Sequence, residues 1–365
     1  MRYKLKEIFD LQMGKTPSRN NTEYWNTNDY KWISIADLTK TGKYISETKE
    51  YLSKSAISDS GIKVIPANTV VMSFKLSIGK TAITAEDMYS NEAIMAFHDR
   101  HVVEILPEYI YYMFKYKNWD EGSNKAVMGK TLNKATLSEV EIEICSIMQQ
   151  RKIVNVLDKM SSVLEKREDE LSVLDTLIKA RFVEMFGDPV SNSYGLPEAT
   201  LPELGEFGRG ISKHRPRNDP KLLGGGYPLI QTGDVAKAGL YITSYNSTYS
   251  ELGLRQSKMW KKGTLCITIA ANIAKTAILT FDACFPDSVV GFTANEKTNN
   301  IFIHYWFLFF QTILESQAPE SAQKNINLKI LSELRVIVPK KEKQDEFVDF
   351  IHQVDKSKVV VASVK

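Results

Sequence analysis

The sequence predicts an α+β fold in which two similar globular segments are each followed by a long helix. Two observations carry this prediction: a heptad pattern of apolar residues, and a series of matches between the two halves of the chain at a nearly constant shift. At 365 residues the chain also exceeds the size at which a single hydrophobic core usually divides. Two domains are therefore expected.

The heptad pattern lies in the middle of the chain and returns at its end. Apolar residues recur at alternating steps of four and three, which is typical of a helix that packs lengthwise against another helix. Arg167 and Arg181 interrupt the first seam, and we expect them to pair with acidic residues of the partner helix or of a bound subunit. The expected seam is Ile153, Leu157, Met160, Leu164, Leu171, Leu174, Ile178 and Met185 in the first helix, and Phe347, Ile351, Val354 and Val361 in the second.

The globular segments also repeat. Short matches occur in the same order in both halves, and their shifts differ by only a few residues, as short loop insertions would produce. A collinear series that ends in a shared heptad register indicates an internal duplication. The matches pair 33–37 with 230–234, 80–83 with 275–278, 132–133 with 326–327, 138–139 with 332–333, and Gln150 with Gln344.

These patterns divide the chain into five segments. Each globular segment contains a short apolar strand, expected at 69–74 and 264–270, and an aromatic helix, expected at 107–116 and 302–313. A stretch rich in Gly, Pro, Ser and Asn follows the first long helix and indicates a linker. The expected boundaries are 1–145 for the first globular domain, 146–186 for the central helix, 187–199 for the linker, 200–339 for the second globular domain and 340–365 for a short terminal helix.

Composition limits the class of protein. The hydrophobic share of 43% and the charged share of 25% are ordinary for a soluble globular chain. The most apolar stretch, 301–310, is too short to span a bilayer, and the N-terminal residues lack the apolar core of a signal peptide. The three cysteines stand far apart, which favours free thiols and a cytoplasmic location. A formal charge of +3 means that any nucleic-acid binding must depend on local patches.

Several sequence motifs carry a family resemblance. They are FVEMFGDP at 182–189, GKTPSRNNTEYW at 14–25, WISIADL at 32–38, and the two helix entrances IMQQRKIV at 147–154 and KKEKQDEFV at 340–348. Together with the duplicated plan, they resemble the DNA-specificity subunit of Type I restriction–modification systems over nearly the whole chain.

The resemblance implies a function without catalysis by this chain. Each globular half would be a target-recognition domain that reads one half of a bipartite asymmetric site in double-stranded DNA. The helices would pair antiparallel as a coiled-coil spacer and dock two methyltransferase subunits. Endonuclease–translocase subunits would join this complex. S-adenosylmethionine would belong to the methyltransferase, and ATP and Mg to the endonuclease. The second helix is shorter than the family usually shows, so truncation of the gene and completion by another chain both remain open.

The sequence contains no recognisable catalytic motif. GKT occurs three times, but the glycine that a phosphate-binding P-loop needs five residues earlier is absent each time. His98 and His101 have no third metal ligand nearby in the sequence. Two alternatives remain. One is an enzyme that itself modifies or cuts DNA, and binding of S-adenosylmethionine to the isolated chain would reveal it. The other is a DNA-binding regulator that dimerises through its helices, and co-purification with a methyltransferase would exclude it.

The candidate DNA-binding residues are cationic, hydroxyl and amide side chains in expected loops at matching places of the repeat. The cluster at 209–217 is the most basic, and five chargeable side chains within nine residues repel one another unless an anion is near. The candidates are Lys15, Thr16, Ser18, Arg19, Asn20, Lys75, Ser77, Lys80, Lys130, Asn133 and Lys134 in the first half, and Arg209, Ser212, Lys213, His214, Arg215, Arg217, Asn272, Lys275, Gln323, Lys324 and Asn325 in the second.

Overall fold

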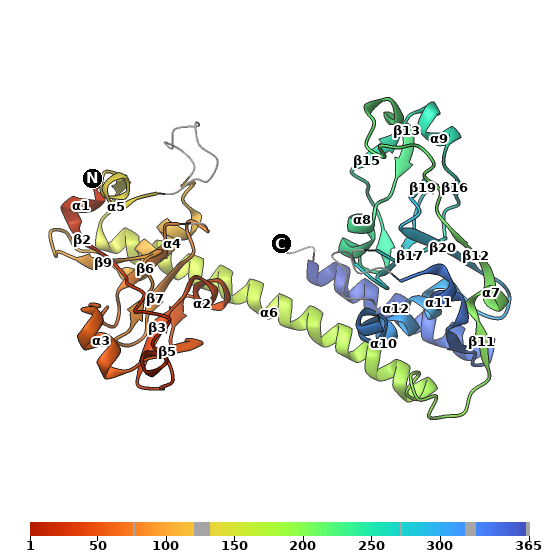
Figure 1. Cartoon of the computed structure of the whole chain (residues 1–365), viewed down its shortest axis with the longest axis horizontal. Helices are drawn as coiled ribbons and strands as arrows, with labels where there is room; N and C mark the ends of the chain where they lie inside the picture. The colour runs from red at the N-terminus through yellow and green to blue at the C-terminus, as the bar shows by residue number, and fades with distance from the viewer. Residues whose placement is uncertain (76, 120–131, 271, 318–325, 363–365) are drawn as a thin grey trace. The chain divides into compact units, whose positions relative to one another are not determined.

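The chain folds into two compact units whose boundary falls inside one long helix, α6 (Ile147–Phe186). The units are Met1–Glu165 and Lys166–Lys365, and each is described by itself. Figure 1 shows the elements of both units. The structure, a computed structural model, describes residues 1–75, 77–119, 132–270, 272–317 and 326–362.

The first unit combines short strands with short helices. Its strands are β1 (Arg2–Lys4), β2 (Phe9–Met13), β3 (Tyr30–Ile33), β4 (Tyr44–Ile45), β5 (Glu50–Leu52), β6 (Val70–Ser73), β7 (Thr81–Thr84), β8 (Tyr89–Ser90), β9 (Ile94–Asp99) and β10 (Glu141–Glu143). Its helices before α6 are α1 (Leu5–Ile8), η1 (Thr22–Tyr24), α2 (Ile35–Lys40), α3 (Lys54–Ser60), α4 (Pro107–Tyr116) and α5 (Lys134–Ser138).

A five-stranded sheet in the order β2-β9-β6-β7-β4 forms the centre of this unit, with a three-stranded sheet β5-β3-β8 and the pair β1-β10 beside it. All residues of β6 and β7 are buried, so both faces of these central strands are covered. Helix α4 packs against these strands, and the ring centroids of Phe97 and Phe114 are 4.7 Å apart. Leu157 of α6 packs against the same core.

The second unit repeats this set of elements. Its strands are β11 (Glu198–Thr200), β12 (Gly205–Arg209), β13 (Leu223–Leu229), β14 (Tyr241–Ile242), β15 (Ser247–Tyr249), β16 (Met259–Trp260), β17 (Leu265–Thr268), β18 (Thr276–Leu279), β19 (Ala283–Cys284), β20 (Val289–Ala294) and β21 (Arg335–Ile337). Its helices after α6 are α7 (Leu201–Leu204), η2 (Pro220–Leu222), α8 (Thr232–Lys237), α9 (Glu251–Arg255), α10 (Asn300–Gln317), α11 (Leu328–Glu333) and α12 (Lys341–Ala362).

The sheet orders confirm the predicted duplication. In the second unit the five-stranded sheet runs β12-β20-β17-β18-β14, which matches β2-β9-β6-β7-β4 strand for strand. The smaller sheet β15-β13-β19-β16 corresponds to β5-β3-β8 with one strand added, and the pair β11-β21 corresponds to β1-β10. The predicted α+β fold of tandem similar domains is therefore confirmed, and the expected strands and aromatic helices are found as β6, β17, α4 and α10.

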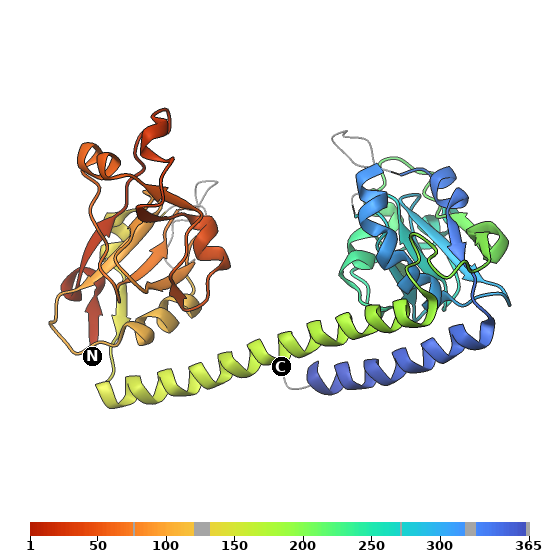
Figure 2. The same cartoon turned by 90° about the horizontal axis from the view of Figure 1, so that it is seen from below.

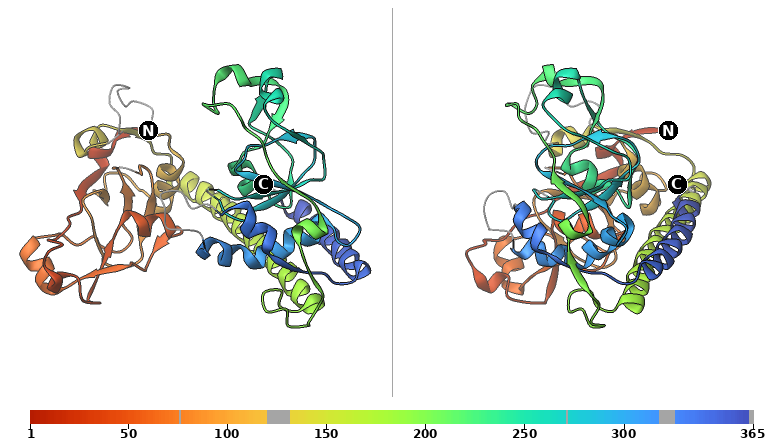
Figure 3. Two further views of the ribbon diagram at one scale, coloured as in Figure 1. Left: turned by 45° about the vertical axis from the view of Figure 1, so that its right-hand side comes forward. Right: turned by 90° about the vertical axis from the view of Figure 1, so that its right-hand side faces the viewer.

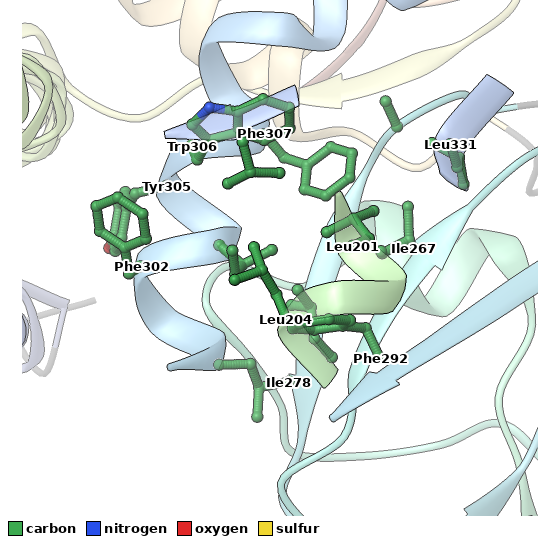
Figure 4. Close-up of a cluster of buried hydrophobic side chains, with 14 of the residues drawn as sticks. Leu201, Leu204, Ile267, Ile278, Phe292, Phe302, Tyr305, Trp306, Phe307 and Leu331 are labelled. Carbon is green, nitrogen blue, oxygen red and sulfur yellow. The ribbon is translucent and has the colours of Figure 1, made fainter. Parts of the chain in front are cut away.

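The core of the second unit lies between its five-stranded sheet and helix α10. Phe302, Trp306 and Phe307 of α10 belong to the same buried cluster as Ile267 and Phe292 of the sheet. In Figure 4, Phe307 lies on the side of α10 that faces the sheet, and Phe302 lies on the opposite side of the helix. All five side chains are completely shielded from solvent. Burying an aromatic or branched side chain of this size contributes about 1.5–3 kcal/mol each, so this layer is a main source of the unit's stability.

Helix α12 runs antiparallel to the second part of α6, as Figures 2 and 3 show. Phe182 of α6 lies edge-on to Phe347 of α12, with ring centroids 5.3 Å apart. Arg181 reaches Glu346 across the two helices at 3.3 Å, which confirms the expected pairing of this seam arginine with its partner helix. Arg167 instead pairs with Glu170 on its own helix.

The predicted seam residues differ in their surroundings. Ile178, Phe347, Ile351 and Val354 are buried in the core of the second unit, and Leu174 and Met185 pack against that core. Leu171 is half-buried, Val361 lies outside the described side chains, and three further seam residues of α6 are exposed. The exposed residues are Ile153, Met160 and Leu164.

A buried histidine makes the stability of the second unit depend on pH. His304 of α10 is shielded from solvent, and its Nδ1 lies 2.9 Å from Oγ1 of Thr276. Burial disfavours the charged ring and lowers the pKa of His304 to about 4, below the ordinary value of about 6.5.

The unfolded chain therefore binds a proton before the folded chain does, and stability is lost as the pH falls from about 6.5 towards 4. We expect His304 alone to cost the unit about 2 kcal/mol between pH 7 and pH 5. Urea unfolding of the wild type and of His304→Leu at both pH values measures this difference. An equal loss in the two proteins would contradict the assignment to His304.

Candidate nucleic-acid interface

In the first unit, the loop that follows β2 holds several of the candidate residues. Lys15 donates its backbone N–H to the carbonyl of Ser90 at 2.8 Å, which fixes the loop against the turn after β8. Lys15, Ser18, Arg19 and Asn20 are exposed, as a loop that meets a ligand requires. Thr16 is half-buried and donates its hydroxyl to the Glu92 carboxylate, so its side chain already has a partner.

Arg19 is the most strongly positioned cation of this loop. Its guanidinium lies 3.8 Å from the ring centre of Trp25 and 4.9 Å from that of Trp32, and it pairs with Glu50. The hydrogen bond from Thr16 lowers the pKa of Glu92 despite partial burial, and the charges of Lys75 and Arg19 act in the same direction. The negative charge of Glu92 is therefore stabilised electrostatically by two of the candidate cations.

In the second unit, the basic loop at 209–217 surrounds one carboxylate. The carboxylate is that of Asp287, whose oxygens lie 2.5 Å from Arg217 and 3.6 Å from Arg215. Arg209 donates its Nε–H to the backbone carbonyl of Asp287 at 2.5 Å. His214 pairs with Asp219 at 3.0 Å. The fold therefore supplies two carboxylates as anions beside this loop, so the charge of the loop does not by itself require DNA. Positive charge still exceeds negative charge there.

A cavity of about 700 Å³ opens beside this loop. Its wall combines guanidinium, hydroxyl, amide and aromatic groups, the mixture that contacts with base edges and phosphates require. Lining residues include Arg209, Ser212, Arg217, Gln231, Tyr249 and Asp287.

The remaining candidates lie in several places. In the first half, Ser77 and Lys80 are exposed and Lys75 is half-buried. Asn133 caps α5 by accepting the N–H of Thr136 at 2.8 Å, a structural use of its side chain, whereas Lys134 is exposed.

In the second half, Lys213 is exposed and its backbone N–H donates to Gln256 at 2.7 Å. Asn272 is exposed, and the ammonium of Lys275 donates to Gln311 at 3.2 Å. Four candidates lie outside the described residues, namely Lys130, Gln323, Lys324 and Asn325.

The structure adds residues that sequence reasoning missed. Asp287 lies 70 to 78 residues from the three arginines that it contacts, and Glu92 lies 76 residues from Thr16, so no local pattern marks either carboxylate. The only available signal was the repeat itself, because Glu92 and Asp287 occupy matching positions at a shift of 195. Tyr249 comes from β15 of the smaller sheet and Gln231 from the N-terminal cap of α8, and only the fold brings both into the cavity wall.

Metal and membrane signals are absent from the described part of the chain. Among these residues no group of three His, Cys, Asp or Glu side chains is placed to hold a metal ion. His98 is half-buried and burial lowers its pKa, while His101 lies 3.3 Å from Asp99. The cysteines are free thiols. No described helix is both long and apolar enough to cross a bilayer.

Comparison with known proteins gives a consistent result. The family described as the Type I restriction modification DNA specificity domain matches residues 1–172 and 198–360. The MjaIX specificity subunit of Methanocaldococcus jannaschii is 29% identical over 192 residues, which cover 51% of this chain and 43% of that protein. The EcoR124I/EcoR124II specificity subunit of Escherichia coli is 28% identical, with coverage of 44% and 40%. These alignments thus span less than half of either relative.

Two solved structures share the fold across the whole chain. One belongs to work on the assembly and conformational transition of a type I restriction–modification system, with a TM-score of 0.59, 15% identity and coverage of 100% of this chain and 93% of that chain. The other is the S subunit from M. genitalium, with a TM-score of 0.54, 15% identity and coverage of 100% and 91%.

The family match covers both halves of the duplicated chain and most of each long helix, so the resemblance expected from the sequence motifs is confirmed. This chain belongs to the Type I restriction–modification DNA specificity family.

Proposed function

We propose that this chain is the specificity subunit of a Type I restriction–modification complex and that each unit reads one half of a bipartite, asymmetric DNA site. The observation that carries the proposal is the duplicated sheet in which a cation-bearing loop meets a carboxylate at the same place in both units. The two loops differ in sequence, which fits two readers of different half-sites. The family match supports the same function.

The proposal includes partners and a division of labour. Double-stranded DNA is the ligand, two methyltransferase subunits dock on the long helices, and endonuclease–translocase subunits complete the complex in the cytoplasm. The chain itself performs no catalysis and holds no cofactor. S-adenosylmethionine belongs to the methyltransferase, and ATP with Mg to the endonuclease. Calorimetric titration of the isolated chain with S-adenosylmethionine tests this division, because heat of binding would contradict it.

Exchanging residues 1–145 for the matching domain of another specificity subunit tests modular reading. We expect one half of the methylated motif to change and the other half to stay as it was. Each wrong base pair costs about 1–3 kcal/mol of binding, so the original half-site should lose nearly all methylation. Sequencing-based mapping of methylated positions in a host that carries the complex measures this. A change in both halves would contradict modular reading.

A further inference from the structure

The duplication places the same chemical groups at the same corner of both five-stranded sheets. Strand pairing fixes the correspondence, because Met13 faces Met95 across β2 and β9, and Arg209 faces Val290 across β12 and β20. The shifts are therefore 196 on the first strand and 195 on its partner. They bring into correspondence Thr16 with Ser212, Arg19 with Arg215, and Glu92 with Asp287.

Both corners hold a glycine at which the loop backbone lies too close to the neighbouring turn for a side chain. A Cβ on Gly14 would come within 2.3 Å of the Ser90 carbonyl oxygen, and a Cβ on Gly210 within 2.4 Å of the carbonyl oxygen of Phe285. The loop after the first strand is thus pressed against the turn that carries the acidic residue. These backbone contacts place the loop beside the residue that carries the carboxylate in both units.

In the second unit, Asp287 organises the guanidinium groups. Its two oxygens face Arg217 at 2.5 Å and Arg215 at 3.6 Å, and its side chain is about 29% exposed. A planar guanidinium held on one edge keeps its remaining N–H groups directed outward in a fixed fork. Arg217 is therefore preorganised for a ligand with two neighbouring acceptors.

Two buried polar atoms at this corner have no hydrogen-bond partner. Oγ of Ser212 is buried, and the residue is about 6% exposed. Oδ1 of Asp287 is also buried, and its close contact with Arg217 has the distance of an ion pair without hydrogen-bond geometry. Both residues and Arg217 line the same cavity. Buried polar atoms are rarely left without a hydrogen bond, and Asp287 Oδ1 already has Arg217 as its ion-pair partner. The Ser212 hydroxyl is therefore the atom at this corner that a ligand in the cavity would satisfy.

We propose, resting on the proposed function, that Arg217 reads a guanine in the second half-site and that Asp287 is the positioning residue that fixes it. Arginine donates two parallel hydrogen bonds to O6 and N7 of guanine. The carboxylate beside it matches the amino group of the paired cytosine. A phosphate would be repelled by Asp287, which favours a base edge over the DNA backbone at this point.

The test uses the full chain in complex with its methyltransferase subunits. The methylated motif is first mapped by sequencing, and each G·C pair of the second half-site is then replaced by A·T in duplexes used for binding. We expect the wild type to discriminate by about 10- to 100-fold at the pair that Arg217 reads. Asp287→Asn and Arg217→Lys should each reduce this discrimination to less than about threefold.

Other readouts separate positioning from a general loss of structure. Binding of Asp287→Asn to unrelated duplex should stay unchanged or rise, because a negative charge is removed near DNA. Discrimination within the first half-site should also be unchanged. Asp282→Asn is the matched control, since it makes the same chemical change in the same unit beside Lys261 and away from the cavity residues.

Three results would overturn the inference while leaving the proposed function intact. They are a second half-site without a G·C pair, unchanged discrimination in Asp287→Asn, and an equal loss of binding to specific and unrelated DNA. A wild-type complex that methylates no bipartite motif would instead refute the proposed function. The two failures are therefore distinguishable in one series of measurements.

Discussion

Replacing Gln344 by leucine is expected to destabilise the second unit by about 3–5 kcal/mol, because the buried amide holds three groups at once. Its Nε2 donates to the carbonyls of Lys297 at 3.0 Å and Pro339 at 2.8 Å, and its Oε1 accepts from Thr298 at 2.8 Å. The residue is completely shielded from solvent, so water cannot replace the lost bonds. Each unsatisfied buried group costs about 1–3 kcal/mol.

The matching residue of the first unit makes the same connections. Gln150 donates to the carbonyls of Glu104 and Cys145, both at 2.9 Å, and accepts from the backbone N–H of Leu106 at 2.9 Å. Gln150→Leu should therefore destabilise the first unit by a similar amount. Each glutamine ties the start of a long helix to the segment before the aromatic helix of its own unit.

Hydrogen exchange measured on peptides of each unit separates the two effects. Gln344→Leu should speed exchange in the second unit, and Gln150→Leu in the first. Gln353→Leu is the control, because Gln353 is exposed on the same helix as Gln344 and its replacement should change stability by less than about 0.5 kcal/mol. Equal behaviour of Gln344→Leu and the control would show that these bonds contribute little.

The duplication could be predicted because its signals are local and ordered. Residues 80–83 and 275–278 are identical and lead into the buried strands β7 and β18, and the heptad register follows each domain. Strand order within the sheets could not be predicted in this way. It depends on pairings such as β4 with β7, in which residues about 40 positions apart run parallel.

The heptad pattern predicted only some of the buried residues of the long helix α6. It predicted Ile178 as buried but omitted Phe182 and Phe186, which are completely shielded. These two rings contact Phe302 of α10 as well as Phe347 of α12, so the helix packs against two elements and buries a wider face than a two-helix seam. A pattern read for one partner helix cannot include residues that face a second partner.

The candidate interface was predictable only in part for a related reason. Clusters of cations in Pro-containing loops are visible in the sequence, and the loop at 209–217 does carry its charge beside a cavity. The carboxylate that orients those cations belongs to a distant turn, so only folding brings Asp287 beside Arg215 and Arg217. The local sequence of a loop therefore predicts the charge of such a site but not the arrangement of its side chains.

Inserting four alanines after Glu165 is expected to abolish methylation of the original motif and to create a motif whose spacer is one or two base pairs longer. The insertion point is the boundary between the two units inside α6, so it falls between the contacts of Leu157 with the first core and those of Leu174 with the second. Four helical residues add about 6 Å, against about 3.4 Å for each base-pair step.

This expectation follows if α6 sets the distance between two half-sites, because a continuous helix of 40 residues transmits an added turn to everything beyond it. Sequencing of methylated positions measures the new spacer directly. Replacing residues 165–168 by four alanines without changing the length is the control, and it should preserve the motif because those side chains are solvated or only half-buried. An unchanged spacer in the insertion variant would mean that the readers find their half-sites independently of the helix, and the role of α6 as a spacer would then have to be abandoned.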